Sequence, residues 1–338
     1  MSNVNVVLAH KLEILDKYLR LEANELIFTK SCEFFVDYGD RWERIVDEKL
    51  DYEFLNSFLL QLATRRHQRF NEKYPSLSCE LPPPYLRYRV QAQHESILFN
   101  SDVSICIRIP SNKRFELESF KLSDKLIKQG WNYDLIRNFI KDKKNVLVSG
   151  GTGSGKTSFL NSLMSEIPKE DRVVTIEDSQ ELFIENENRT QIAIPKEEGV
   201  YTYTTAINNA MRLRPDRLFL GEIDIRNTLA FLRVNNSGHE GNLSTLHANS
   251  TEDSINAIIT NSMFSGMNTS REAMLDYIRS AIDYIIQIAR VKKERIIVDI
   301  LNVKEYLKPS PQLNTQTYQS SANNIKAVSD THEWVKSY

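Results

Sequence analysis

Apolar residues recur at helical spacing in two stretches near the start of the chain. Leu8, Leu12, Leu15 and Leu19 form one stripe. A second stripe, Phe54, Leu55, Phe58 and Leu62, follows Asp51, a residue suited to cap the helix that it begins. Between the stripes, residues 33–38 and 42–46 flank Gly39-Asp40 as two strands flank a hairpin turn. The pattern predicts an α+β domain.

Two later segments alternate apolar and polar residues, as strands do when one of their faces is buried. Leu86, Tyr88, Val90 and Ala92 alternate with polar residues in the first, and Ile105, Ile107 and Ile109 in the second. If both strands belong to one sheet, Arg89 and Arg108 lie on its polar side. Periodicity alone is equally satisfied by two arginines in water.

From Trp131 to about Lys308, short apolar runs alternate with helical patterns, which is typical of a mainly parallel sheet with helices on its faces. The expected strands are 145–149, 172–176, 217–220, 243–246, 283–289 and 295–303. We therefore expect an N-terminal α+β domain over residues 1–110, a charge-rich linker over 111–130 and an α/β domain over 131–308. Residues 309–338, rich in Ser, Asn, Gln and Thr, are expected to form a flexible tail.

Composition narrows the classes of function. Among 338 residues, 43 are Lys or Arg and 45 are Asp or Glu, a net charge of −2 that argues against a general polyanion binder, although local basic patches remain open. No segment approaches 18 consecutive apolar residues, so any membrane contact is expected to be peripheral. Cys32, Cys79 and Cys106 lack the paired spacing of a zinc site and are expected to be reduced, in the cytoplasm.

The segment from Gly150 to Thr157 carries the clearest chemistry. It stands between an apolar run and a helical stripe, and its glycines allow successive amide N–H groups to point at the phosphates of a nucleotide. Lys156 is expected to reach the β- and γ-phosphates, and the Thr157 hydroxyl to ligate Mg²⁺. The expected phosphate-binding residues are Gly151, Thr152, Gly153, Ser154, Gly155, Lys156, Thr157 and Ser158. The segment predicts binding of ATP with Mg²⁺.

Acidic residues and a histidine follow three of the expected strands. Glu177 and Asp178 come after 172–176, and Glu222 after 217–220. Because ligands of open α/β sheets bind at the carboxyl ends of strands, these carboxylates converge near the phosphate loop if both strands neighbour 145–149. We expect Glu222 to position the attacking water, Glu177 as the second candidate, and Asp178 to hold Mg²⁺ through a water. His247, after strand 243–246, is expected to contact the γ-phosphate.

Four motifs occur in the order found in the type II/IV secretion NTPase superfamily. They are a Walker A motif at 150–157, an Asp box at 175–182, an atypical Walker B motif at 214–222 and a His box at 238–248. The chain, from about 20 to 305, is most similar to the traffic ATPases of bacterial type IV secretion systems, because it is short and begins with a compact domain. Its segments 88–91 and 104–111 look like those through which that family offers arginines to the nucleotide phosphates, which makes Arg89 and Arg108 candidate ligands.

This resemblance implies a RecA-like P-loop NTPase domain preceded by a smaller α+β domain. It also implies an ATPase that forms a ring-shaped homo-hexamer, peripheral at the inner face of the cytoplasmic membrane, with inner-membrane secretion-complex components as partners. The ring would power pilus assembly and the export of protein or DNA, with nucleic acid involved only as an exported substrate. The sequence departs from the family where Asp224 replaces the usual arginine, and Arg226 is the alternative source of that contact.

Three other functions stay open. A type II secretion or pilus-retraction motor belongs to the same superfamily, and the retraction motor is the closer rival because the four-cysteine zinc module common in extension ATPases is absent. A DNA-translocating or helicase-like motor would need a basic, aromatic channel, which a net charge of −2 does not favour. The third alternative, suggested by Asp224, is a nucleotide-regulated scaffold that barely hydrolyses ATP.

Overall fold

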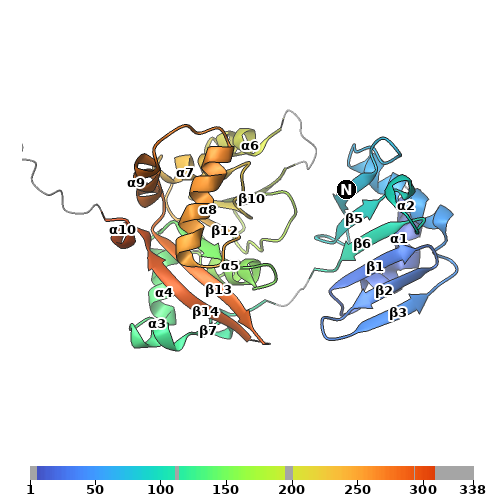
Figure 1. The fold of residues 1–338 in the computed structure, drawn as a ribbon, viewed down its shortest axis with the longest axis horizontal. Coiled ribbons are helices and arrows are strands. Elements are labelled where there is room, and N and C mark those ends of the chain that lie inside the picture. The colour runs from blue at the N-terminus through green and yellow to red at the C-terminus, as the bar shows by residue number, and fades with distance from the viewer. Residues whose placement is uncertain (1–5, 111–113, 195–200, 293, 309–338) are drawn as a thin grey trace, which may run out of the picture.

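The computed structural model describes residues 6–110, 114–194, 201–292 and 294–308. The tail expected over 309–338 lies outside these residues. Within them, two sheet-containing domains follow each other along the chain (Figure 1). No helix of the described ranges has the length and apolar character needed to cross a membrane.

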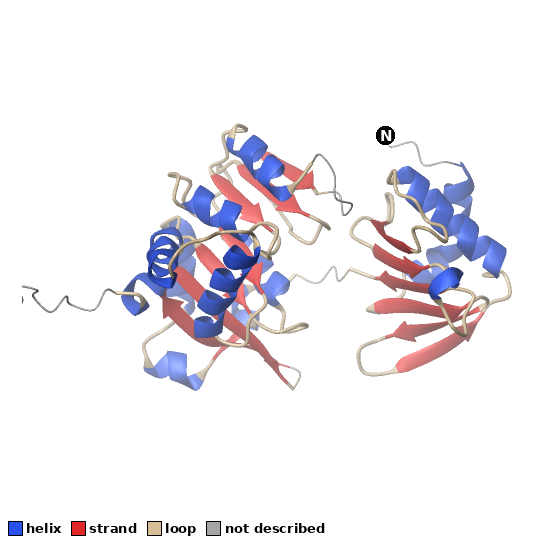
Figure 2. Cartoon of the chain, turned by 45° about the horizontal axis from the view of Figure 1, so that its top comes forward, coloured by secondary structure: helices blue, strands red, loops and turns tan. Residues whose placement is uncertain are grey.

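The N-terminal domain is built on an antiparallel sheet whose strand order is β3-β2-β1-β6-β5-β4. Its elements are α1 (Val6–Leu19), β1 (Glu25–Lys30), β2 (Glu33–Asp37), β3 (Trp42–Val46), α2 (Tyr52–Arg65), β4 (Ser76–Glu80), β5 (Arg89–Gln93), the 3₁₀ turn η1 (Glu95–Ile97) and β6 (Ser104–Arg108). The apolar stripes of both helices belong to one core with Phe28 and Phe34 of the sheet. Both helices lie on one side of the strands (Figure 2). Asp51 caps α2 by accepting the N–H of Phe54 at 2.8 Å, as predicted.

The second domain places parallel strands at its centre. Its strands are β7 (Lys121–Leu122), β8 (Val146–Ser149), β9 (Val173–Glu177), β10 (Arg189–Ala193), β11 (Arg217–Leu220), β12 (Leu243–Leu246), β13 (Tyr284–Val291) and β14 (Glu294–Asn302). One sheet has the order β12-β8-β13-β14-β7, and a second has the order β10-β9-β11. The two sheets meet where the Ile223 N–H donates to the carbonyl oxygen of Thr245 at 2.8 Å. All six strands expected in this domain are present.

Helices cover both faces of these strands and enclose two cores. They are α3 (Asp124–Lys128), α4 (Tyr133–Lys141), α5 (Lys156–Met164), α6 (Tyr203–Met211), α7 (Thr228–Asn235), α8 (Thr251–Phe264), α9 (Arg271–Ala281) and α10 (Val303–Tyr306). Residues of α4 and α5 belong to one core, and residues of α6 to α9 belong to the other. The parallel strands therefore run between two helical layers, with their carboxyl ends free to carry a site.

The stretch expected as a linker, 111–130, packs largely with the second domain. The 3₁₀ turn η2 (Leu117–Ser119) and Phe120 bury apolar side chains in the core that α5 shares, and β7 pairs with β14. Residues 111–113 lie outside the described ranges. The expectation of a linker over the whole stretch is wrong, because its few apolar residues are anchored by distant parts of the chain rather than by a local period.

Candidate active site

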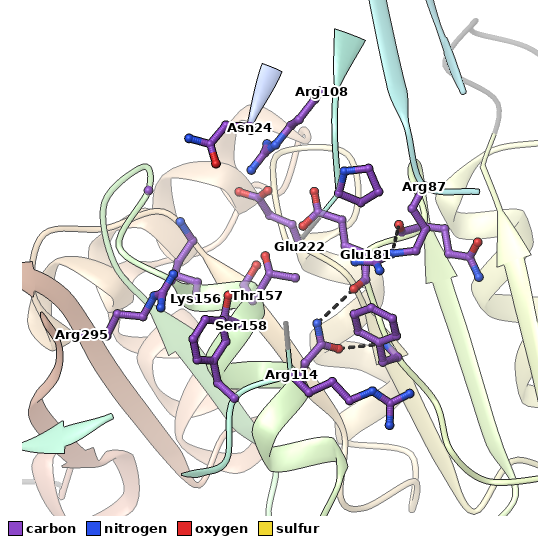
Figure 3. A pocket seen from close by; sticks show the side chains of 18 of the residues that line it. Asn24, Arg87, Arg108, Arg114, Lys156, Thr157, Ser158, Glu181, Glu222 and Arg295 are labelled. Carbon is purple, nitrogen blue, oxygen red and sulfur yellow. Dashed lines mark hydrogen bonds between the residues drawn. The ribbon is translucent and has the colours of Figure 1, made fainter. Parts of the chain in front are cut away.

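A cleft of about 810 Å³ opens between the two domains and is lined by residues of both. Figure 3 shows Asn24 and Arg108 of the N-terminal domain above this space, with Lys156, Thr157 and Ser158 of α5 below them. Glu222, from the end of β11, lies between the two sets. The cleft therefore collects the phosphate loop, a strand-end carboxylate and N-terminal arginines in one place.

The phosphate loop needs glycine for two different reasons. At Gly150, a Cβ would fall 2.4 Å from the carbonyl oxygen of Ile288, so a side chain has no room. Gly153 and Gly155 have φ angles of 71° and 99°, in the left-handed region that other residues rarely adopt. The turn sends the chain into α5 at Lys156, whose first N–H groups and dipole favour an anion. Of the predicted phosphate-binding residues, Thr152, Gly153, Gly155, Lys156, Thr157 and Ser158 line the cleft, whereas Gly151 and Ser154 do not.

Three polar side chains form a connected group beside the loop. Lys156 Nζ lies 3.1 Å from His247 Nδ1, and His247 Nε2 lies 3.0 Å from Glu222 Oε1. Burial lowers the pKa of Lys156, which the Glu222 charge opposes. Burial raises the pKa of Glu222, against the effect of His247 and Lys156. The strand ends thus bring together a lysine, a histidine and a carboxylate, as the sequence predicted for these three residues.

Glu177 lies elsewhere, which corrects the expectation that both glutamates converge on the phosphate loop. The neighbours of β8 are β12 and β13, so neither β9 nor β11 lies beside it. Glu177 is only 5% exposed and does not line the cleft. Its Oε1 accepts the N–H groups of Glu181 and Leu182 at 2.8 and 2.9 Å, and burial raises its pKa to about 7. Glu177 therefore fixes the loop after β9.

The two N-terminal arginines lie side by side. Arg89 and Arg108 are direct cross-strand partners on β5 and β6, so the two strands do belong to one sheet, and both arginines line the cleft. The next partners in the same row are Glu25 on β1 and Asp37 on β2. Arg89 Nη2 also lies 2.8 Å from Glu181 Oε1 of the second domain. Arginine and carboxylate charges of both domains thus meet across the cleft.

Comparison with known proteins agrees with this geometry. Residues 92–328 match the family described as type II/IV secretion system protein. The chain belongs to this family. It is 26% identical over 350 residues to the type IV secretion system protein VirB11 of Bartonella henselae, covering 93% of this chain and 96% of that one. To the VirB11 protein of Brucella abortus biovar 1 it is 29% identical over 257 residues, covering 68% and 70%.

Solved structures share the fold. The Legionella pneumophila ATPase DotB is 20% identical, with a TM-score of 0.63 and coverage of 95% of this chain and 87% of that one. The pilus retraction motor PilT with bound ADP is 18% identical, with a TM-score of 0.63 and coverage of 94% and 88%. The predicted fold class, a RecA-like P-loop domain after a smaller α+β domain, and the resemblance to type IV secretion traffic ATPases are confirmed. The chain is thus a member of a secretion-system ATPase family.

This family member departs from the usual Walker B pattern at Asp224, and the structure gives the consequence. The Asp224 carboxylate accepts hydrogen bonds from the backbone N–H of Arg226 at 2.7 Å and from its Nε at 2.8 Å. The Arg226 guanidinium lies 5.1 Å from the centroid of the Tyr203 ring and 3.9 Å from Asp178. Neither Arg226 nor Asp178 lines the cleft. Asp224 therefore holds Arg226 outside the cleft lining.

Several residues of the cleft carried no sequence signal. Arg87, at a φ of 73°, places its guanidinium 3.7 Å from the Phe183 ring centroid and donates from Nε to the Gln180 carbonyl at 3.3 Å. The Gln180 N–H donates in turn to Glu80 of the N-terminal domain at 3.0 Å. Gln180 and Phe183 stand in a loop without periodicity, so only the folded chain reveals that the N-terminal domain contacts the segment after β9.

Proposed function

We propose that the protein is a Mg²⁺-dependent ATPase that works as a ring-shaped homo-hexamer and powers type IV secretion. The main support for ATP hydrolysis is the connected group of Lys156, His247 and Glu222 at the edge of the phosphate loop. Membership of the type II/IV secretion system protein family supports the secretion role. The VirB11 proteins, which match over most of their length, support type IV secretion in particular.

The cleft fits the phosphates of ATP and a magnesium ion. The turn at Gly153 and Gly155, whose φ angles glycine adopts readily, leads into α5, whose first N–H groups suit phosphate oxygens at the cleft. The Thr157 hydroxyl and the Glu222 carboxylate supply oxygen ligands of the kind that Mg²⁺ prefers, directly or through water. Asp178 does not line the cleft, so it would reach the ion only through water. When bound, Mg²⁺ would help to neutralise the charge of the transferring phosphoryl group.

The chain's own groups divide the work of hydrolysis. Lys156 balances negative charge on the β- and γ-phosphates. Glu222 orients the attacking water and accepts its proton, and because burial raises its pKa, its carboxylate is a stronger base than an ordinary glutamate. His247, between these two side chains, contacts the γ-phosphate side of the cleft. Glu177 acts on the reaction through the loop that it holds rather than by contact with the water.

Hydrolysis moves the domains because arginines of the N-terminal domain respond to the γ-phosphate. Arg89 and Arg108 contact it when ATP is bound and lose that contact after release. We assign residues 1–110 to one moving domain and residues 131–308, with the segment 114–130 that packs on them, to the other. The hexamer lies at the cytoplasmic face of the inner membrane, where it contacts membrane components of the secretion complex and moves protein or DNA as exported substrate.

Phosphate release from ATP, measured with and without single-stranded DNA, tests this function. We expect Mg²⁺-dependent release that single-stranded DNA does not stimulate. Strong stimulation by DNA would indicate a translocating or helicase-like motor. ATP binding with almost no release would indicate a nucleotide-regulated scaffold instead.

A further inference from the structure

Two arginines face each other at one edge of the cleft. Arg290 on β13 and Arg295 on β14 are cross-strand partners in the hairpin, and both line the cleft. In the described part of the chain, neither guanidinium has a carboxylate within 4 Å, and Arg295 Nε is buried without a hydrogen-bond acceptor. Burial lowers the pKa of Arg295, and the charge of Arg290 lowers it further. Two adjacent cations without a counter-ion are costly unless an anion joins them.

Packing fixes Arg295 against the phosphate loop. A Cβ on Gly155 would fall 2.7 Å from Arg295 Cδ and 2.8 Å from Nε, so the side chain lies directly on the last residue before α5. The Arg295 guanidinium carbon stands 4.3 Å from the centroid of the Phe115 ring. Figure 3 shows Arg295 beside Lys156 and Ser158. The guanidinium is therefore held in place before any ligand arrives.

Two other arginines of the cleft have acidic partners. Arg89 is paired with Glu181 at 2.8 Å, and Arg114 is paired with Glu185. An anion that binds Arg89 must displace a carboxylate, whereas one that binds Arg290 and Arg295 displaces none. The hairpin pair is therefore better prepared to bind an anion than Arg89 or Arg114.

We infer that Arg295, assisted by Arg290, binds the α-phosphate of the nucleotide. This inference rests on the proposed function, because it assumes that the phosphate loop holds ATP or ADP. Lys156 and Thr157 serve the β- and γ-phosphates and Mg²⁺. Arg295 lies on the Gly155 side of the loop. We place the α-phosphate, the one next to the nucleoside, on this side. A planar guanidinium can hold two phosphate oxygens at once, which sets the direction in which the nucleoside leaves the loop.

Calorimetric titration of the full-length chain with ADP and with pyrophosphate tests the inference. Arg295→Ala is expected to weaken ADP binding by about tenfold or more, the effect of losing one hydrogen bond to a charged group. Pyrophosphate, which fills the Lys156 side of the loop without a nucleoside phosphate, should lose less affinity. Arg295→Lys keeps the charge and should recover part of the ADP affinity. Arg271→Ala removes one arginine that contacts Asn256 outside the cleft, and should leave both affinities unchanged.

The outcomes separate this inference from the function on which it rests. If the wild-type protein binds neither ligand, the proposed function fails, and the inference fails with it. If the wild type binds both ligands and Arg295→Ala binds ADP equally well, only the inference is overturned. Equal losses for ADP and pyrophosphate in both Arg295 variants, with a lower Tm before any ligand is added, would show that Arg295 merely packs on Gly155 and would also overturn it.

Discussion

Replacing Glu177 by glutamine should remove a pH dependence of stability that one buried carboxyl group creates. The side chain is 5% exposed, and burial raises its pKa from 4.5 to about 7. Each pKa unit corresponds to about 1.4 kcal/mol. Above pH 7, where Glu177 is ionised in both states, the free energy of unfolding is therefore about 3 kcal/mol lower than below pH 4.5, where Glu177 is protonated in both.

The direction of the effect follows from where the proton is bound. Between pH 4.5 and about 7, the folded protein keeps a proton on Glu177 that the unfolded chain has already lost. The free energy of unfolding therefore falls as the pH rises through this window, and the loss is complete above the folded-state pKa. Glutamine does not titrate, and its amide oxygen can still accept the N–H groups of Glu181 and Leu182.

Urea unfolding followed by tryptophan fluorescence from pH 5 to 8 measures the difference. The wild type should lose roughly 2 to 3 kcal/mol relative to Glu177→Gln across this range, as the titration above predicts. Glu170→Gln, which neutralises an exposed carboxylate of the same domain, should keep the wild-type slope. Parallel curves for the wild type and Glu177→Gln would refute the reasoning, because the slope would then come from other groups.

Two further predictions concern hydrolysis and movement. Glu222→Gln should retain ATP binding and lose phosphate release by about 10²–10⁴-fold, as expected when a general base is removed; a larger loss in Glu177→Gln, with Glu222→Gln nearly normal, would reverse the two roles. The double variant Arg89→Ala, Arg108→Ala should lose much of its ATPase activity and fail to compact with a non-hydrolysable ATP analogue in small-angle scattering, whereas the wild type should form a compacting ring of about six subunits. Normal compaction and turnover in the double variant would contradict the coupling.

Much of the fold could be predicted because its signals are local. The strands β8, β11 and β12 are buried along their whole length, so they stand out as short apolar runs. In β10, by contrast, the residues alternate between exposed and half-buried, and the sequence offers no apolar period. The short strands β1 and β4 were not predicted either, although each buries two alternate residues.

The site divides in the same way. The phosphate loop, Glu222 and His247 could be predicted, because a strand end and the loop that follows it are neighbours in sequence. The placement of Glu177 could not, because its carboxylate turns into the loop after β9 and accepts the N–H groups of Glu181 and Leu182 there. Arg295 reaches Gly155 from a hairpin about 140 residues later in the chain, and such a contact leaves no trace in a local pattern.

Phosphate release by Lys156→Ala tests the central claim, that this cleft binds and hydrolyses ATP, most directly. The Lys156 ammonium group contacts the Gly151 carbonyl oxygen and His247 at the cleft, so its removal should leave the fold and the circular dichroism spectrum unchanged. The account predicts that the wild type releases phosphate from ATP and that Lys156→Ala, equally well folded, does not. Wild-type turnover in Lys156→Ala would contradict it.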